Sequence, residues 1–154
     1  MKIHKLIEPG HIFLGLEADD APSALAAVAE LWAPEIGLAP RRVVAGLLER
    51  EVLGSTSVGN GFAIPHCKLQ GQRGIAVAVA RFDRGVPFGG DGHPPVQLLF
   101  MVLSAPDQPA AHLQVLSQIA RLLKRPALRA ELLAAADPQA LAEAIRRTAA
   151  AEGL

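Results

Sequence analysis

Two runs of apolar residues constrain the fold of this chain more than any other feature. Residues 75–82 read IAVAVARF and residues 96–103 read VQLLFMVL, and each run has the length of a β-strand with hardly a polar side chain. Near-continuous apolar strands are typical of sheets that are covered on both faces by helices. The two runs therefore predict two buried strands between layers of other structure.

Segments with helical spacing of apolar residues lie on either side of these runs. Asp20 is placed to cap a helix that has Pro22 in its first turn, where the missing N–H does no harm. Residues 37–40 end that helix, and the apolar spacing predicts a second helix over about residues 41–53. Three later helices are expected to begin near Pro109, at Pro126 and at the Asp137-Pro138 pair.

The remaining segments complete one layered domain. Residues 12–16 and 61–64 are short strand candidates, and the glycine- and proline-rich residues 83–95 are expected to form a loop. Helices before, between and after apolar strands give an α/β fold. A chain of 154 residues has the length of about one domain. We therefore expect a single domain over residues 1–154.

Composition and charge exclude several classes of function. Fifteen Lys and Arg side chains balance fifteen Asp and Glu, so the chain lacks the basic excess of a nucleic-acid-binding protein. The single cysteine, Cys67, cannot form an intramolecular disulfide and fits a reducing compartment. Charges, Pro9 and Gly10 interrupt the N-terminal segment, and no apolar run reaches the roughly 18 residues of a membrane span. We expect a cytoplasmic protein that neither inserts into membranes nor binds nucleic acid.

The segment TSVGNGFAIPH, residues 56–66, places His66 after a glycine-rich loop, a short apolar stretch and a proline. An imidazole titrates near pH 6.5, so at neutral pH it is mostly uncharged and has a free ring nitrogen that can act as a nucleophile. A phosphoryl group on that nitrogen forms a phosphoramidate, which transfers onward readily. Pro65 fixes its own backbone and restricts Ile64, which stiffens the approach to the ring. A metal ligand and a packed core histidine are the alternatives, and the flanking loop favours the nucleophile.

Residues around His66 can supply the groups that hold a phosphate. Gly59 and Gly61 allow the main chain to come close and to direct N–H groups at an anion. Arg50 can provide the cation, because guanidinium geometry matches phosphate. Side-chain donors are available from Ser55, Thr56, Ser57 and Asn60.

His112 is the second candidate residue. It precedes Leu116 by four residues and Ile119 by seven, which places it on the core-facing stripe of a helix. From there it can reach the strand that carries His66, either to donate an N–H to the phosphate or to orient the nucleophilic ring. Pattern alone favours the other interpretation, a partly buried histidine whose polar edge meets solvent or a backbone carbonyl.

Other chemistries have weaker support. The GNG segment lacks the Lys-Ser or Lys-Thr of a nucleotide-binding loop, and the histidines and Cys67 lack the paired spacing of a zinc site. A Cys–His hydrolase is disfavoured because adjacent strand residues point apart, so Cys67 is interpreted as a packing residue. Asp91 and His93 are interpreted as solvated turn residues, with a place for Asp91 at the rim of the site as the alternative.

Five short motifs, taken in order, resemble a known family over essentially the whole chain. The motifs are Arg50-Glu51, Ser55-Thr56, Gly59-Asn60-Gly61, Ala63-Ile64-Pro65-His66 and Ala111-His112-Leu113. Together they are similar to an enzyme IIA domain of the fructose–mannitol class of the bacterial phosphotransferase system, and most of all to its nitrogen-regulatory branch.

This resemblance implies a fold, a mechanism and a partner. The fold is a mixed, mostly parallel β-sheet with helices on both faces. His66 is expected to be phosphorylated on Nε2 by the phosphohistidine of a small HPr-like carrier, called NPr in the nitrogen branch. His112 is then the second active-site histidine and Arg50 the site cation, while Thr56 and Asn60 fall on the loop positions of the motif. No metal or other cofactor is implied.

Two outputs fit such a phosphocarrier. A sugar-specific IIA passes phosphate to a IIB component, whereas a nitrogen-regulatory IIA is a signalling protein whose phosphorylation state changes which regulator, kinase or transporter it binds. The unbroken stretch over residues 53–69 and the absence of a fused IIB or membrane segment favour the regulator. A non-catalytic binding domain is the third possibility, against which both histidines and the arginine argue.

Overall fold

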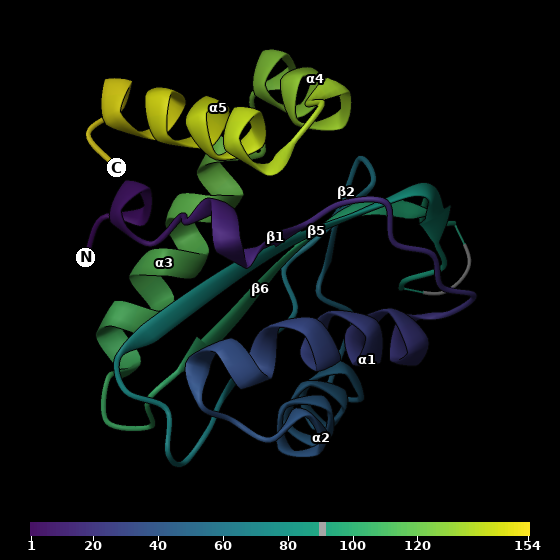
Figure 1. Cartoon of the computed structure of the whole chain (residues 1–154), viewed down its shortest axis with the longest axis vertical. Coiled ribbons are helices and arrows are strands. Elements are labelled where there is room, and N and C mark those ends of the chain that lie inside the picture. Colours follow the sequence, from purple (N-terminus) through teal and green to yellow (C-terminus); the bar gives the residue numbers. More distant parts are fainter. Residues whose placement is uncertain (90–91) are drawn as a thin grey trace.

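A computed structural model describes residues 1–89 and 92–154, so the expectation for Asp91 lies outside the described residues. A central sheet lies between two layers of helices (Figure 1). One layer contains α1 (Ala21–Trp32) and α2 (Pro40–Glu51). The other contains α3 (Pro109–Leu122), α4 (Pro126–Ala134) and α5 (Pro138–Ala151). Three short 3-10 helices are η1 (Ile3–Lys5), η2 (Pro9–His11) and η3 (Ala33–Ile36).

The sheet is mixed, as predicted. Its strands are β1 (Ile12–Phe13), β2 (Ser57–Gly59), β3 (Phe62–Ala63), β4 (His66–Lys68), β5 (Ile75–Val86) and β6 (Val96–Ser104). They lie in the order β1-β5-β6-β3-β2, and β4 also pairs with β6. In the described part of the chain three pairings are parallel and two are antiparallel. The longest is antiparallel, between β5 and β6, so these two strands form the centre of the sheet.

The two central strands bury alternate side chains on opposite faces. Val77 and Val79 of β5 pack with the α3–α5 layer, whereas Ala78 and Ala80 pack with the α1–α2 layer. The same alternation divides the residues of β6 from Leu98 to Leu103, as expected for a pleated strand. Both faces are covered, so the prediction of helices on both sides of the sheet is confirmed.

The predicted helix starts are also confirmed. The Asp20 carboxylate accepts the Ser23 N–H at 2.8 Å, and Asp137 accepts the Ala140 N–H at the same distance. These bonds satisfy backbone donors that have no partner inside the helix. Gly37, with φ +74°, ends the first helical segment.

The predicted loop over residues 83–95 is partly wrong, because β5 continues to Val86. Val86 pairs with Val96, beyond an irregularity of register between Arg81 and Val86. Gly85 has φ +76°, which a side chain tolerates poorly. The glycine that suggested a loop instead accompanies a bulge in a longer strand.

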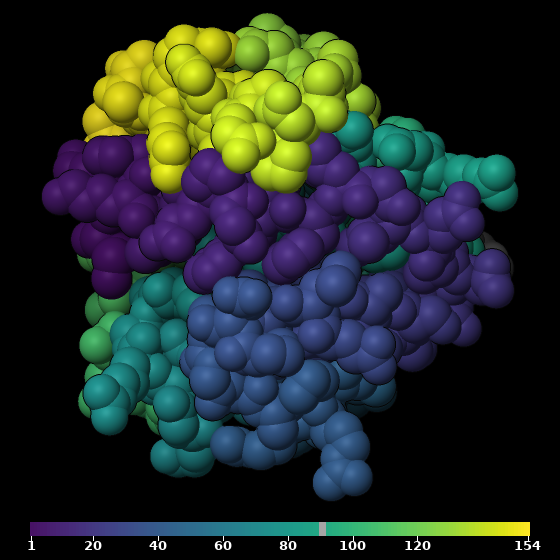
Figure 2. All heavy atoms as spheres, in the orientation of Figure 1, coloured from purple at the N-terminus to yellow at the C-terminus, as the bar shows by residue number. Residues whose placement is uncertain are grey.

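The N-terminal segment lies against the C-terminal helices. Figure 2 shows it as a continuous surface band, in purple, between α5 in yellow and α1 in blue. Ile3 and Ile7 are fully buried and join the core beneath α3 and α5. Within residues 1–89 and 92–154, no helix has both the length and the apolar character needed to cross a membrane.

Candidate active site

His66 is the first residue of β4, which runs parallel to β6 with His66 opposite Val102. The next residue, Cys67, is buried in the core beneath α2. Because successive strand residues point to opposite faces, His66 points to the side of the sheet that α3 covers. Pro65 donates no N–H, but its carbonyl accepts the Val102 N–H at 2.9 Å, so the chain stays attached to β6 as it enters the site.

One hydrogen bond defines which nitrogen of His66 has a free lone pair. Its Nδ1 lies 2.7 Å from the backbone carbonyl oxygen of Ile64. A carbonyl oxygen only accepts, so Nδ1 carries the proton and, in the neutral ring, Nε2 keeps a free lone pair. Burial lowers the pKa of His66, and the charge of Arg50 lowers it further, against the opposing effects of the Ile64 hydrogen bond and Glu51. The ring is therefore neutral at neutral pH.

His112 faces His66 from the first turn of α3. Its side chain is 5% exposed, and the two ring centroids are 5.4 Å apart with an angle of 54° between the ring planes. Its Nδ1 lies 2.5 Å from the hydroxyl oxygen of Ser104 at the end of β6. Burial, together with the nearby His66 and Lys68, lowers the pKa of His112 to about 4. The sequence pattern alone favoured a packed histidine, whereas the structure places this ring beside His66.

A close contact between α2 and β4 brings Arg50 to the two histidines. A Cβ atom at Gly46 would lie 3.0 Å from both Cys67 Sγ and Leu69 Cδ2, so the helix can approach the strand this closely only at a glycine. Arg50 follows Gly46 by four residues and lies on the same face of the helix. Its Nη1 donates to the Gly54 carbonyl at 2.9 Å, at the end of α2.

His66 and Arg50 line two adjoining hollows. One hollow of about 490 Å³ is also lined by His112, Lys68 and Leu53. The other, of about 440 Å³, is lined in addition by Ser55, Thr56 and Leu113. A neutral imidazole thus shares its hollow with a second imidazole, with the cationic groups of Arg50 and Lys68, and with the carboxylate of Glu49. This arrangement can hold a tetrahedral anion against the ring nitrogen.

Thr56 is fixed by a residue to which the sequence analysis gave no role. The Glu51 carboxylate accepts the Thr56 N–H at 3.2 Å through Oε2 and the Thr56 hydroxyl through Oε1. A sequence signal for Glu51 existed: it is an acidic residue at the C-terminus of a helix, where the helix dipole disfavours negative charge. Such a residue needs a compensating contact, and here it anchors the loop that leads to His66.

The glycine-rich turn lines neither of these two hollows. Gly59, Asn60 and Gly61 all have positive φ, from +56° to +84°, and connect β2 to β3. Gly59 and Asn60 line a different hollow, with Lys124 and Arg129. Positive φ explains the residue types as turn chemistry. The structure brings Thr56 and Ser55 to His66, but it does not bring these three residues into either hollow that His66 lines.

Cys67 behaves as the packing residue that the sequence predicted. Burial raises the pKa of its thiol to about 12, so it holds its proton and is not a nucleophile at neutral pH. In residues 1–89 and 92–154, no three His, Cys, Asp or Glu side chains gather closely enough to hold a metal ion.

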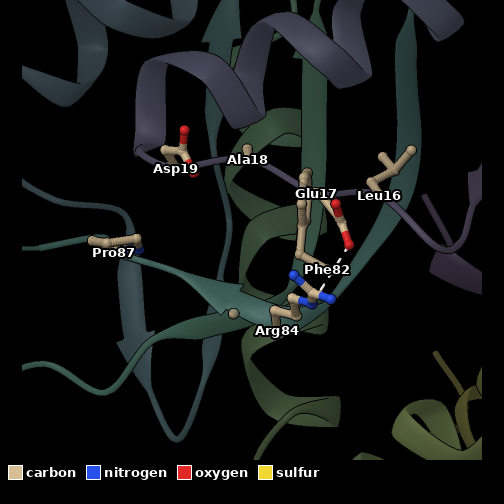
Figure 3. A pocket seen from close by; sticks show the side chains of 8 residues that line it. Leu16, Glu17, Ala18, Asp19, Phe82, Arg84 and Pro87 are labelled. Carbon is tan, nitrogen blue, oxygen red and sulfur yellow. Dashed lines mark ion pairs between the residues drawn. The ribbon is translucent and has the colours of Figure 1, made fainter.

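A further hollow, of about 260 Å³, lies at the junction of β5 with the segment that precedes α1 (Figure 3). Its charged groups include Glu17 and Arg84, which form an ion pair at 3.5 Å between largely exposed side chains. It contains none of the predicted site residues.

Comparisons with known proteins show the family to which this chain belongs. Residues 5–148 match the family described as "Phosphoenolpyruvate-dependent sugar phosphotransferase system, EIIA 2", and the chain belongs to this family. It is similar to a nitrogen regulatory protein of Bradyrhizobium diazoefficiens, with 38% identity over 141 residues and 92% of each chain covered. A nitrogen regulatory protein of Pseudomonas aeruginosa is 34% identical over 142 residues, again with 92% of each covered.

The fold is similar to a crystal structure of the nitrogen regulatory protein IIA-Ntr from Neisseria meningitidis. The TM-score is 0.86 and the sequence identity 28%, with 93% of this chain and 98% of that chain covered.

Proposed function

We propose that this chain, over residues 1–154, is a cytoplasmic phosphocarrier of the nitrogen-regulatory IIA type that accepts a phosphoryl group on His66 from an HPr- or NPr-like carrier protein. The observation that carries this proposal is the hydrogen bond from His66 Nδ1 to the Ile64 carbonyl. It leaves Nε2 as a neutral nucleophile in a ring that lines the same hollow as Arg50 and His112.

The transfer step uses these three residues. The Nε2 lone pair of His66 attacks the phosphorus of the carrier's phosphohistidine, and a new P–N bond forms. The old P–N bond breaks, and its electron pair returns to the carrier's imidazole. Arg50 and His112 stabilise the oxygens of the transferring group, which carry negative charge throughout. The Nδ1–H of His66 stays bound to Ile64, which stabilises the positive charge that develops on the ring.

Exposed apolar side chains around the hollows fit a protein donor. Val52 and Leu53 are more than 80% exposed at the end of α2, and Leu113 is 66% exposed beside His112. Apolar side chains that gather around a polar site are typical of surfaces that bind another protein. A protein carrier can cover them while it presents its phosphohistidine.

The regulatory output is supported by the relatives, because two curated proteins similar over nearly the whole chain are named nitrogen regulatory proteins. In this output the phosphorylated and free forms bind a regulator, kinase or transporter differently. A sugar-specific IIA that passes phosphate to a IIB component is the second candidate, since the matched family is named for sugar transport.

Phosphorylation in a reconstituted system tests the proposal. The chain is mixed with enzyme I, an HPr-type carrier and phosphoenolpyruvate, and we expect it to gain one acid-labile phosphate. His66→Ala should abolish labelling, whereas His11→Ala, which changes a histidine packed near Trp32, should not. Equal labelling of His66→Ala and wild type would contradict the assignment. Rapid transfer of the phosphate to a IIB protein would instead support the sugar-specific function and contradict the regulatory one.

A further inference from the structure

Ser104 is a buried hydroxyl at the end of an otherwise largely apolar strand. It is 0% exposed and is the last residue of β6. A buried hydroxyl costs free energy unless it forms a hydrogen bond. Its Oγ lies 2.5 Å from Nδ1 of His112, and among the described residues this is the hydrogen bond found for that hydroxyl.

This contact is compatible with two positions of the proton on His112. A hydroxyl can donate to Nδ1, in which case the proton of the neutral ring is on Nε2. It can instead accept from Nδ1–H, in which case Nε2 bears a lone pair. The ring is neutral at neutral pH because burial lowers the pKa of His112 to about 4. The tautomer therefore decides whether His112 donates or accepts in the hollow.

The occupants of the hollow favour the first arrangement. His66 already contributes a lone pair on Nε2, because its Nδ1–H is bound to Ile64. A phosphoryl group on His66 adds only acceptor oxygens. The ring of His112 is 5.4 Å from that of His66. A lone pair on Nε2 of His112 would repel the lone pair of free His66 and also the oxygens of a phosphoryl group bound to His66. A proton on Nε2 would instead pair with the phosphoryl oxygens.

We propose that Ser104 is a positioning residue: its hydroxyl donates to Nδ1 of His112 and so keeps the proton on Nε2, as a hydrogen-bond donor to the phosphoryl group on His66. This inference rests on the proposed phosphocarrier function. It assigns a role in transfer to a residue in the core of the protein, which acts only through His112.

Removal of the Ser104 hydroxyl should weaken the preference of His112 for the tautomer that has its proton on Nε2. In Ser104→Ala, the buried Nδ1 lone pair of His112 loses its donor, so the ring redistributes between its two neutral tautomers. The hydrogen bond from His112 Nε2–H to the transferring group then forms in only part of the molecules. We therefore expect the rate of phosphoryl transfer to fall about three- to tenfold. Ser104→Thr keeps a hydroxyl at this position and should retain most of the rate.

The tautomer can be measured directly by NMR. Two-bond ¹H–¹⁵N correlations of histidine side chains in the unphosphorylated wild-type chain distinguish protonated from unprotonated ring nitrogens. We expect His112 to carry its proton on Nε2 in the wild type and to show a mixture in Ser104→Ala. A wild-type His112 with its proton on Nδ1 would overturn the proposal, whatever the variants do.

A matched control separates positioning from stability. Val79→Ala removes buried volume from the centre of β5, away from His112, and should lower stability with the tautomer and transfer rate unchanged. If Ser104→Ala transfers phosphate at the wild-type rate, or if Val79→Ala slows transfer equally, the positioning role is wrong. A wild-type chain that shows the predicted tautomer but accepts no phosphate would instead contradict the proposed function.

Discussion

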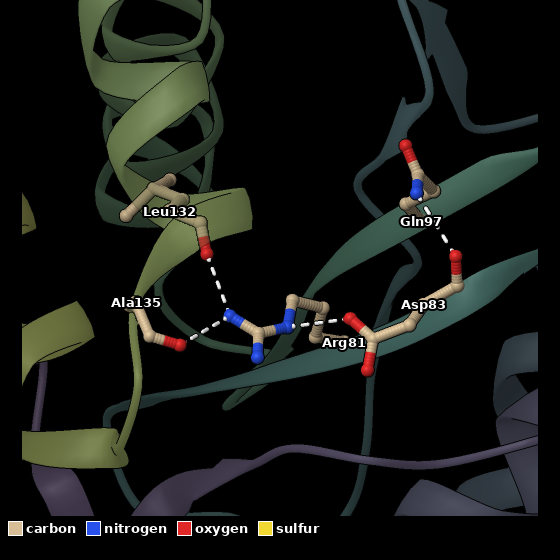
Figure 4. Close-up of polar contacts among 5 residues, drawn as sticks. All are labelled: Arg81, Asp83, Gln97, Leu132 and Ala135. Atoms are coloured by element: carbon tan, nitrogen blue, oxygen red, sulfur yellow. Dashed lines mark hydrogen bonds and ion pairs between the residues drawn. The ribbon is translucent and has the colours of Figure 1, made fainter.

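Two arginines near opposite ends of β6, Arg81 in the sheet and Arg50 in α2, differ in how the folded chain uses their side chains. Arg81, opposite Leu98 near the start of β6, is 9% exposed. Its Nη1 donates to the carbonyls of Leu132 and Ala135 at the end of α4, at 2.9 and 2.8 Å, and its Nε lies 2.9 Å from the Asp83 carboxylate (Figure 4). Two hydrogen bonds from one nitrogen and one ion pair hold this guanidinium against the protein.

Arg50 lies near the other end of β6, beside the strand that pairs with Val102 to Ser104. Among the described residues its side chain makes one hydrogen bond, to the Gly54 carbonyl. A guanidinium has five N–H donors, so several remain for an anion in the hollows that His66 lines. The comparison teaches that surroundings distinguish the two: Arg81 is buried and holds the end of α4, whereas Arg50 is less buried and lines the hollows beside His66.

Replacement of Arg81 should affect stability. Arg81→Ala leaves two carbonyls at the end of α4 without their charged donor, and we expect the free energy of unfolding to fall by about 3 kcal/mol. Chemical denaturation measures this loss. Arg147→Ala is the control, because Arg147 also binds a residue of α4, Glu131, but in solvent. Equal stability of the two variants would contradict a structural role for Arg81. At temperatures where Arg81→Ala is folded, the variant should still accept phosphate.

Replacement of Arg50 should affect transfer. Arg50→Ala removes a cation that stabilises the transferring group, and we expect the rate of phosphoryl transfer to fall by about 100-fold with little change in stability. Rapid-quench measurement of labelling gives the rate. Arg42→Ala is the control on the same helix, because Arg42 binds the Gln70 carbonyl and does not line the hollows. A wild-type rate of transfer for Arg50→Ala would contradict a role for Arg50 in phosphoryl transfer.

The region around His66 should also make stability depend on pH, through the buried ring of His112. Burial lowers the pKa of His112 from 6.5 to about 4, so between these values the unfolded chain binds more protons. The contribution of neutral His112 is therefore present above about pH 6.5 and is lost as the pH falls to about 4. Between about pH 7 and about pH 5, the wild type should lose about 2 kcal/mol more than His112→Gln. Parallel losses in the two proteins, measured by urea unfolding, would contradict a buried neutral ring.

The charges next to His66 should have a smaller effect, on its pKa. Arg50 lowers this pKa and Glu51 raises it, so Arg50→Gln should raise the pKa of His66 and Glu51→Gln should lower it. NMR titration of the His66 ring gives the pKa. A shift in the same direction in both variants would show that the two charges do not act on the ring as described.

The fold was predictable where the pattern is local. Apolar runs identify β5 and β6, and the capping residues Asp20 and Asp137 mark two helix starts, because these signals depend on neighbouring residues. The pairing of β4 with β6 was not predictable, since its register depends on residues more than 30 positions away. The continuation of β5 to Val86 was missed because Gly85 has the same signature in a bulge as in a loop.

The site was predictable only in part, for the same reason. His66, Arg50 and His112 follow from motif and spacing, and the structure brings them together. Gly59, Asn60 and Gly61 carry the composition of a phosphate-binding loop, but positive φ in a tight turn requires the same residues. Glu51 and Ser104 were given no role because their contacts with Thr56 and His112 arise only in the folded chain.

The position of the phosphate on the ring of His66 tests the central claim most directly. The chain is phosphorylated with phosphoenolpyruvate, enzyme I and an HPr-type carrier, and the bonded nitrogen is identified from the ¹⁵N and ³¹P spectra of ¹⁵N-histidine-labelled protein. Because Nδ1 donates to Ile64 at 2.7 Å, we predict a single P–N bond at Nε2 of His66. A phosphate on Nδ1, or on any residue other than His66, would contradict the account.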